Sequence, residues 1–158
     1  MIRSRQRFLN GGYYQLLSDA ISNTINKCPL SFEQKLLDIG CGEGYYLQQL
    51  RNIAERSNAK LELLGLDVSK AGVRLAAKRK LNALLVVDSA YKIPLFDHSI
   101  DTVLSVFSPI SPDETARVLK TDGYLIMAGP GEEHLTGLTA HIYDQHQPHA
   151  GNFKALDD

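Results

Sequence analysis

The sequence predicts an α/β fold in which a parallel sheet carries helices on both of its faces. Short apolar runs alternate with segments whose apolar residues recur every three or four positions, which is typical of strands alternating with helices. The apolar runs are separated by enough chain for the crossover connections that parallel strands require. A glycine-rich turn, residues 40–44, follows the first predicted strand and marks a place where such sheets hold nucleotide-like ligands.

The composition indicates a globular domain without a strong overall charge. The chain has 158 residues, of which 44% are hydrophobic and 22% charged, and its formal net charge is −1. It is long enough to form a proper core, and any binding to nucleic acid must use a local patch. Cys28 and Cys41 form no Cys-x-x-Cys pair, so neither a zinc site nor a disulfide framework is indicated. No apolar run approaches the ~20 residues of a membrane span, and we expect a cytoplasmic protein without membrane contact.

The first 30 residues are expected to form a basic segment and a helix that covers the core. Arg3, Arg5 and Arg7 favour a frayed, solvated chain end, and a phosphate-contacting patch is the alternative. Between Tyr13 and Lys27 the apolar residues form a helical stripe. Cys28-Pro29 ends this helix, because the residue before a proline avoids the helical conformation.

The rest of the chain alternates between strands and helices as far as residue 143. Ser69 and Ser111 are helix-capping residues, and Pro112 suits the first turn of the helix after Ser111. The predicted strands are residues 35–39, 61–67, 83–87, 100–107 and 124–128. The predicted helices are residues 44–53, 69–81, 111–120 and 132–143, with a loop through 91–96 and a turn at Asp122-Gly123.

One side of the predicted helix 69–81 is strongly basic. It carries Lys70, Arg74, Lys78, Arg79 and Lys80. We interpret these side chains as a solvated face, and contact with RNA is the alternative.

The carboxyl ends of the predicted strands form a connected rim, where a ligand is expected to bind. Asp38 ends the first strand and is placed to orient the glycine loop. Asp67 ends the second strand and can accept hydrogen bonds from both hydroxyls of a ribose, with helix capping as the alternative. Asp88 ends the third strand and can accept from an adenine amino group, or serve only as a turn residue.

The spacing of the glycines excludes two other nucleotide-binding loops. The dinucleotide fingerprint G-x-G-x-x-G needs a glycine where Tyr45 stands, and no P-loop Gly-Lys pair is present. Cys41 has no histidine arranged with it, so covalent catalysis is not indicated. His146 and His149 have a metal-like spacing without a helical frame or cysteine partners, and we expect no metal site.

The pattern Asp-x-Gly-x-Gly-x-Gly, residues 38–44, resembles motif I of the S-adenosylmethionine-dependent methyltransferases. The chain resembles the class I members of that group over almost its whole length. It is most similar to the large-subunit (23S) rRNA guanine-N1 methyltransferases. The segments that carry this closer similarity are 7–9, 12–14, 38–46, 65–70, 76–79, 107–109 and 130–135.

This resemblance implies a Rossmann-like fold and the transfer of a methyl group to N1 of a guanine in rRNA. It implies that S-adenosyl-L-methionine contacts residues of the rim and of the covering segments, namely Tyr14, Asp38, Gly40, Cys41, Gly42, Gly44, Asp67, Val68, Asp88, Ser89 and His134. The candidate base-binding residues are Phe107, Ser108 and Pro109.

Members of that family begin with a four-cysteine zinc domain, and class I methyltransferases usually end with two further strands. We therefore expect the chain to be a catalytic-domain portion that lacks both, with a cofactor-binding core at residues 31–145 and a His-containing tail at 146–158. A small-molecule methyltransferase of the same fold and a non-catalytic cofactor-binding module are the alternatives. The oligomeric state is open, a homodimer included.

Overall fold

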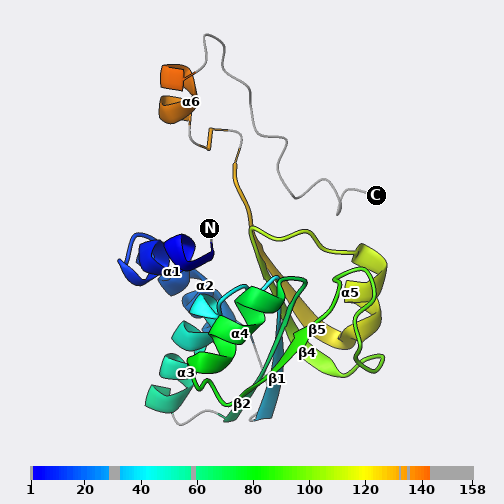
Figure 1. Cartoon of the computed structure of the whole chain (residues 1–158). Helices are drawn as coiled ribbons and strands as arrows, with labels where there is room; N and C mark the ends of the chain where they lie inside the picture. Colours follow the sequence, from blue (N-terminus) through cyan, green and yellow to red (C-terminus); the bar gives the residue numbers. More distant parts are fainter. Residues whose placement is uncertain (1, 29–32, 58–59, 132, 135, 143–158) are drawn as a thin grey trace.

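Five parallel strands form a single sheet in the order β3-β2-β1-β4-β5 (Figure 1). The structure is a computed structural model that describes residues 2–28, 33–57, 60–131, 133–134 and 136–142. The strands are β1 (Glu33–Ile39), β2 (Lys60–Asp67), β3 (Ala83–Val87), β4 (Ile100–Val106) and β5 (Leu119–Ala128). The parallel α/β sheet predicted from the sequence is confirmed.

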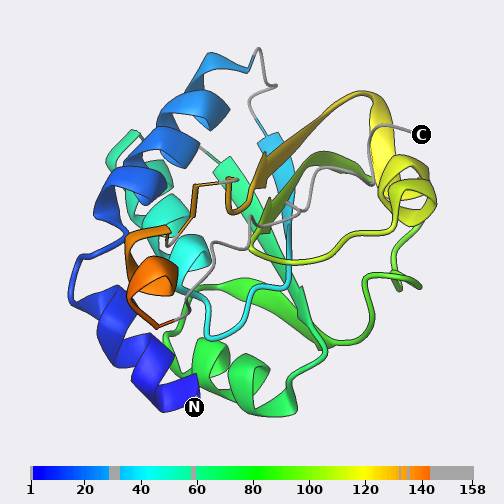
Figure 2. The ribbon, with the colours of Figure 1, turned by 90° about the horizontal axis from the view of Figure 1, so that it is seen from above.

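Helices cover both faces of this sheet, as Figure 2 shows from above. Four of them pack on one face and one on the other, and a sixth follows β5. The first four are α1 (Ile2–Asn10), α2 (Gln15–Lys27), α3 (Tyr45–Ser57) and α4 (Lys70–Lys78). The others are α5 (Pro112–Val118) on the opposite face and α6 (Thr136–Ile142) after β5. None of the helices in the described segments is long and apolar enough to cross a bilayer.

The central strand β1 separates two hydrophobic cores. Leu36 packs in the core beneath α1, α2 and α3, and its neighbour Leu37 packs in the core beneath α5. Adjacent residues of a strand point to opposite faces, so a strand buried on both sides is a continuous apolar run. This explains why Leu36, Leu37 and Ile39 are all apolar and almost fully buried.

The strand order reverses at β1, which fixes the place of the ligand site. β2 pairs with one edge of β1 and β4 pairs with the other. The connections that leave β1 and β4 therefore diverge, and a crevice opens at the carboxyl ends of these two strands. The loop of residues 40–44 begins at that point.

The N-terminus differs from the expectation of a frayed end, because residues 2–10 form helix α1. Leu9 is buried in the core, and the Gln6 side chain donates a hydrogen bond of 3.3 Å to Glu43 in the glycine loop. The helix is short and its only large apolar residues besides Phe8 are Ile2 and Leu9, two turns apart. Its stability therefore comes from these tertiary contacts, which local sequence does not reveal.

The Asp122-Gly123 turn is also different from the prediction. α5 ends at Val118 rather than Lys120, and β5 already begins at Leu119. The ladder passes from the pair Ile100–Leu119 to the pair Thr102–Tyr124, so residues 120–123 bulge out of β5 instead of separating it from the helix.

Replacing Leu104 by Ala tests the core beneath α2 and α3. Leu104 is fully buried in the middle of β4, so the substitution leaves a cavity and should lower the free energy of unfolding by about 2–5 kcal/mol. Urea denaturation measures this change. Leu84→Ala on the edge strand β3 is the matched control, because Leu84 is 55% exposed and its loss should cost under about 0.5 kcal/mol. Equal losses in the two variants would contradict the assigned core.

Candidate functional site

The glycine loop, residues 40–44, is anchored to the neighbouring strand by its own backbone. The N–H groups of Gly40 and Cys41 both donate to the carbonyl of Leu66, at 2.7 and 3.1 Å. Gly40 has a φ of +75°, and a Cβ at this position would lie 2.0 Å from the Oγ of Ser108. Only glycine therefore lets the loop after β1 pass this close to the loop after β4.

Gly44 serves the end of the loop, where α3 begins. Its φ is +79°, and an added Cβ would stand 3.0 Å from the Cβ of Ala76 in α4. The missing side chain lets α4 pack against the start of α3. The loop thus leaves its backbone open to a ligand at the N-terminal end of a helix, where partial positive charge gathers.

Asp67 joins the glycine loop to the start of α4. One carboxylate oxygen accepts the N–H of Gly42 at 2.8 Å, and the other accepts the N–H of Ser69 at 2.7 Å. Ser69 in turn caps α4 through the N–H of Gly72. Asp67 therefore takes part in the structural role weighed for it, yet each carboxylate oxygen can accept a second hydrogen bond from a ligand.

Asp38 lies beneath the loop as a buried carboxyl group. It is 1% exposed, and its Oδ2 has no hydrogen-bond partner among the described residues. Burial, with a smaller contribution from the nearby Asp67 charge, raises the pKa of Asp38 to about 8, while Arg5 acts in the opposite direction. A cationic ligand group near this carboxyl would favour its ionised form.

Arg5 reaches this region from α1. Its Nη1 lies 3.2 Å from the point where a Cβ of Gly42 would stand, and its charge is felt at Asp38. The side chain is exposed and forms no ion pair with any residue in the described ranges. The sequence gave Arg5 no place at the site, because the helix that carries it was not foreseen.

Glu43 and Arg79 form a second feature that the sequence did not reveal. Glu43 is 1% exposed, and its Oε2 accepts the Nε–H of Arg79 at 2.9 Å within an ion pair. Arg79 also donates to the main-chain carbonyl of Glu43 and to Asn10 at the end of α1. Arg79 is therefore a structural link between α1, the loop and α4, and the prediction that it lies on a solvated face is wrong.

Cys41 is chemically quiet. The side chain is 5% exposed, and burial together with the neighbouring Asp38 and Asp67 charges raises the pKa of its thiol. A thiol is nucleophilic only as the thiolate, which this environment disfavours. Cys41 thus fills space in the loop rather than providing a nucleophile.

The next two candidates lie at the carboxyl ends of β2 and β3. Val68 is 73% exposed beside Asp67, so its side chain is free to cover a bound ligand. Asp88 accepts the N–H of Ser89 at 2.8 Å, and the Ser89 hydroxyl accepts the N–H of Tyr91 at 3.2 Å. These bonds shape the turn after β3 and leave Asp88 with further acceptor capacity.

Aromatic side chains line the mouth of the site after β4. Tyr14 meets Phe107 edge to face, with 5.8 Å between ring centroids, and the ring of His134 lies 6.2 Å from that of Phe107. Phe107 has a φ of +54°, a strained value for a bulky residue. Ser105 donates to the carbonyl of Ser108 at 2.9 Å and so holds the Phe107–Pro109 turn in shape. The structure thus brings Tyr14, Phe107 and His134 together, as the sequence grouping required.

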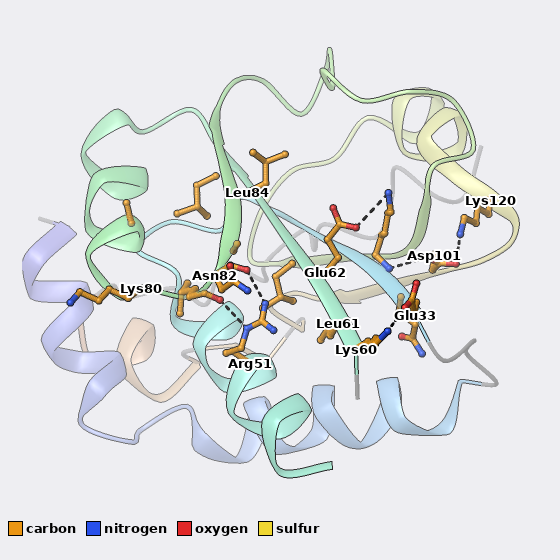
Figure 3. Close-up of a pocket in the computed structure, with 17 residues that line it drawn as sticks. Glu33, Arg51, Lys60, Leu61, Glu62, Lys80, Asn82, Leu84, Asp101 and Lys120 are labelled. Carbon is orange, nitrogen blue, oxygen red and sulfur yellow. Dashed lines mark hydrogen bonds and ion pairs between the residues drawn. The ribbon is translucent and has the colours of Figure 1, made fainter. Parts of the chain in front are cut away.

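A large open groove lies at the opposite end of the sheet (Figure 3). It is lined by the amino ends of the strands, and its charges neutralise one another: Lys60 pairs with Glu33 at 2.6 Å, and Lys120 with Asp101 at 2.7 Å. Arg51 donates to the carbonyls of Leu81 and Asn82. Because ligands of this architecture bind at the carboxyl ends of the strands, the groove is separate from the candidate site.

No cluster of three or more metal-binding side chains occurs within the described ranges. His146 and His149 lie outside those ranges, as does the predicted tail 146–158. The absence of a metal site there remains a prediction.

Replacing Asp38 by Asn should change how stability depends on pH. The unfolded carboxyl ionises near 3.8 and the folded one at about 8, so the folded protein binds the extra proton between these values. The free energy of unfolding should therefore fall as pH rises from about 4 to about 8 through this group. Urea titrations at several pH values should show a flatter profile for D38N. The control is D122N at an exposed position, and a D38N profile that parallels the wild type would contradict the prediction.

Comparison with known proteins gives this geometry a family. Residues 36–123 match the model of the methyltransferase domain. YxjB of Bacillus subtilis, whose name assigns it provisionally to the 23S rRNA guanine-N1 methyltransferases, is 33% identical over 90% of this chain and 51% of its own length. The 23S rRNA (guanine(748)-N(1))-methyltransferase of Streptomyces fradiae is 30% identical over 87% of this chain and 49% of its own.

A solved structure supports the fold. A SAM-dependent methyltransferase from Aquifex aeolicus superposes with a TM-score of 0.67 and 22% identity, over 94% of this chain and 78% of that one. The chain spans about half the length of the curated relatives it matches. Its glycine loop, strand-end acids and sheet order agree with the family model, and the chain belongs to the class I S-adenosyl-L-methionine-dependent methyltransferases.

Proposed function

We propose that the chain transfers a methyl group from S-adenosyl-L-methionine to N1 of a guanine in large-subunit rRNA. The observation that carries this proposal is the meeting of the glycine loop and the exposed Phe107 ring at one edge of the sheet, beside Asp67. Such an edge can hold a nucleoside cofactor and a flat base side by side. The names of the Bacillus and Streptomyces relatives support rRNA as the substrate.

The residues of the site fit this cofactor. Its ribose offers two hydroxyl donors, which suit the unused acceptor positions of Asp67. Its amino-acid end carries an ammonium and a carboxylate. The buried Asp38 carboxyl, whose Oδ2 has no partner among the described residues, suits the cation, and the Arg5 guanidinium suits the anion.

The adenine end of the cofactor suits the residues beyond β3. Asp88 and Ser89 present acceptor groups at the carboxyl end of that strand, and Val68 offers an exposed apolar surface next to the ribose site. Tyr14 and His134, together with the backbone of residues 40–44, complete the proposed set of cofactor contacts. When bound, the cofactor supplies an electrophilic methyl group.

Phe107 is the proposed platform for the target base. Its ring is exposed, and Tyr14 and His134 support it from two sides. A positive φ at a phenylalanine costs about 1–3 kcal/mol and is found mostly at functional sites. Bases that are turned out of a helix are commonly stacked on aromatic side chains. Phe107, Ser108 and Pro109 would thus hold the guanine beside the cofactor, and catalysis would come mainly from positioning.

The direct test is methyl transfer to unmodified 23S rRNA. Tritiated S-adenosylmethionine should label the RNA, and reverse transcription should stop at one guanine because a methyl group on N1 blocks base pairing. Phe107→Ala should lower the rate about tenfold or more through the lost stacking. Phe96→Ala is the control, since Phe96 is 88% exposed in the loop before β4. Labelling of small molecules but not of RNA would favour a small-molecule methyltransferase, and cofactor binding without transfer would favour a binding module.

A ligand pair tests the two ends of the cofactor site separately. S-adenosylhomocysteine and 5′-methylthioadenosine share the adenosine and the thioether, but only the first has the amino-acid group. Asp67→Ala should weaken both by about 1–3 kcal/mol, because both contain the ribose. Arg5→Ala should weaken only S-adenosylhomocysteine, by about 1.5–3 kcal/mol. Calorimetry measures both, with Arg3→Ala as the control. Equal effects of R5A on the two ligands would contradict the role of Arg5.

A further inference from the structure

The cationic side chains of this protein are concentrated in two segments that meet in space. Residues 2–18 and 68–87 contain eight of the 17 Lys and Arg residues and none of the 18 Asp and Glu residues. The rest of the chain therefore holds nine cations against 18 acids. The net charge of −1 conceals this strong separation.

The fold places the two segments side by side. Near the start of α1, the Cδ1 of Ile2 lies 3.1 Å from where a Cβ of Gly72 in α4 would stand. Just beyond α4, Arg79 donates to Asn10 at the end of α1, at 3.0 Å. α1 and α4 are thus joined at two places into one surface, and both figures of the whole chain show them as neighbours (Figures 1 and 2).

The cations on this surface are available to a partner. Six of them are exposed, and no residue of the described ranges forms an ion pair with them: Arg3, Arg7, Lys70, Arg74, Lys78 and Lys80. Elsewhere in the described chain Lys35, Lys60, Arg117 and Lys120 each pair with a carboxylate. A group of unneutralised cations on an acidic protein favours an anionic macromolecule as the partner.

Exposed aromatic rings accompany these cations. Phe8 and Tyr13 are 48% and 73% exposed, and their rings stack at 4.7 Å. Phe8 also contacts Tyr14, which contacts Phe107 at the mouth of the candidate site. A row of rings thus leads from the basic surface to the proposed base platform. Cations beside stacked rings are the pattern that binds single-stranded nucleic acid, whereas an acidic protein would need only the cations.

We propose that this α1–α4 surface binds the backbone and bases of the RNA strand that leads to the target guanine. The proposal rests on the proposed function for its choice of RNA. The cations of α1 and α4 contact phosphates, and Phe8 with Tyr13 stacks on a base outside the reacting site. This surface explains how a protein with a net charge of −1 can hold a polyanion.

The test is binding of a fluorescein-labelled single-stranded RNA of about 20 nucleotides, followed by anisotropy from about 50 to 200 mM salt. The variant Arg7→Ala/Arg74→Ala/Lys78→Ala should bind about 10- to 100-fold more weakly at low salt. The slope of log K against log salt should fall by about 2–3, since each lost phosphate contact lowers it by nearly one. The matched control is Lys27→Ala/Arg56→Ala/Lys92→Ala, which removes the same charge from exposed positions elsewhere.

Phe8→Ala should weaken binding about tenfold without changing the salt slope, with Phe96→Ala as its control. All variants should bind S-adenosylhomocysteine as the wild type does, which shows that they are folded. Equal losses in the two triple variants, absence of RNA binding by the wild type, or displacement of RNA by polyglutamate at equal charge would overturn the proposal. If RNA binds as expected and no methyl group is transferred, the proposed function fails and this surface stands.

Discussion

The Asp67 carboxylate, which accepts one amide from the glycine loop and one from the start of α4, is the interaction on which the site depends. It fixes the distance between the loops after β1 and β2. The two amides that donate to Leu66 hold the same loop from its other end. Because hydrogen bonds to a charged acceptor are stronger than neutral ones, the loop is held in its binding shape before any ligand arrives. Rigidity of this kind reduces the entropy lost on binding.

Negative charge under the loop is the second constraint. Asp38, Glu43 and Asp67 lie within one short stretch of structure, and two of them are almost completely buried. Arg79 compensates Glu43, while Asp38 stays protonated near neutral pH because its pKa is about 8. The protein therefore avoids placing three bare carboxylates together, yet it keeps one that can ionise beside a cation. α1 matters here because it supplies Arg5 and accepts the outer hydrogen bond of Arg79.

Local sequence was sufficient for the sheet, most helices and the rim of strand ends, because alternation, capping residues and the glycine spacing are short-range signals. Ser69 and Ser111 cap helices as predicted. It was insufficient where a contact joins distant segments. The link between Arg79 and Glu43 spans 36 residues, and α1 is held mostly through that link and through Leu9. The bulge of residues 120–123 was missed because Asp-Gly marks a turn without saying whether the strand continues beyond it.

Cys41 has a consequence for the durability of the site. Its sulfur lies 3.0 Å from where a Cβ of Gly65 would stand, so the backbone of β2 closes over the thiol. A raised thiol pKa and a 5% exposed side chain leave almost no thiolate for peroxide or alkylating agents to attack. A binding loop that contains a cysteine can thus keep its shape under oxidative stress, with no enzyme needed to repair it. Gly65, on a different strand, provides the space that this protection requires.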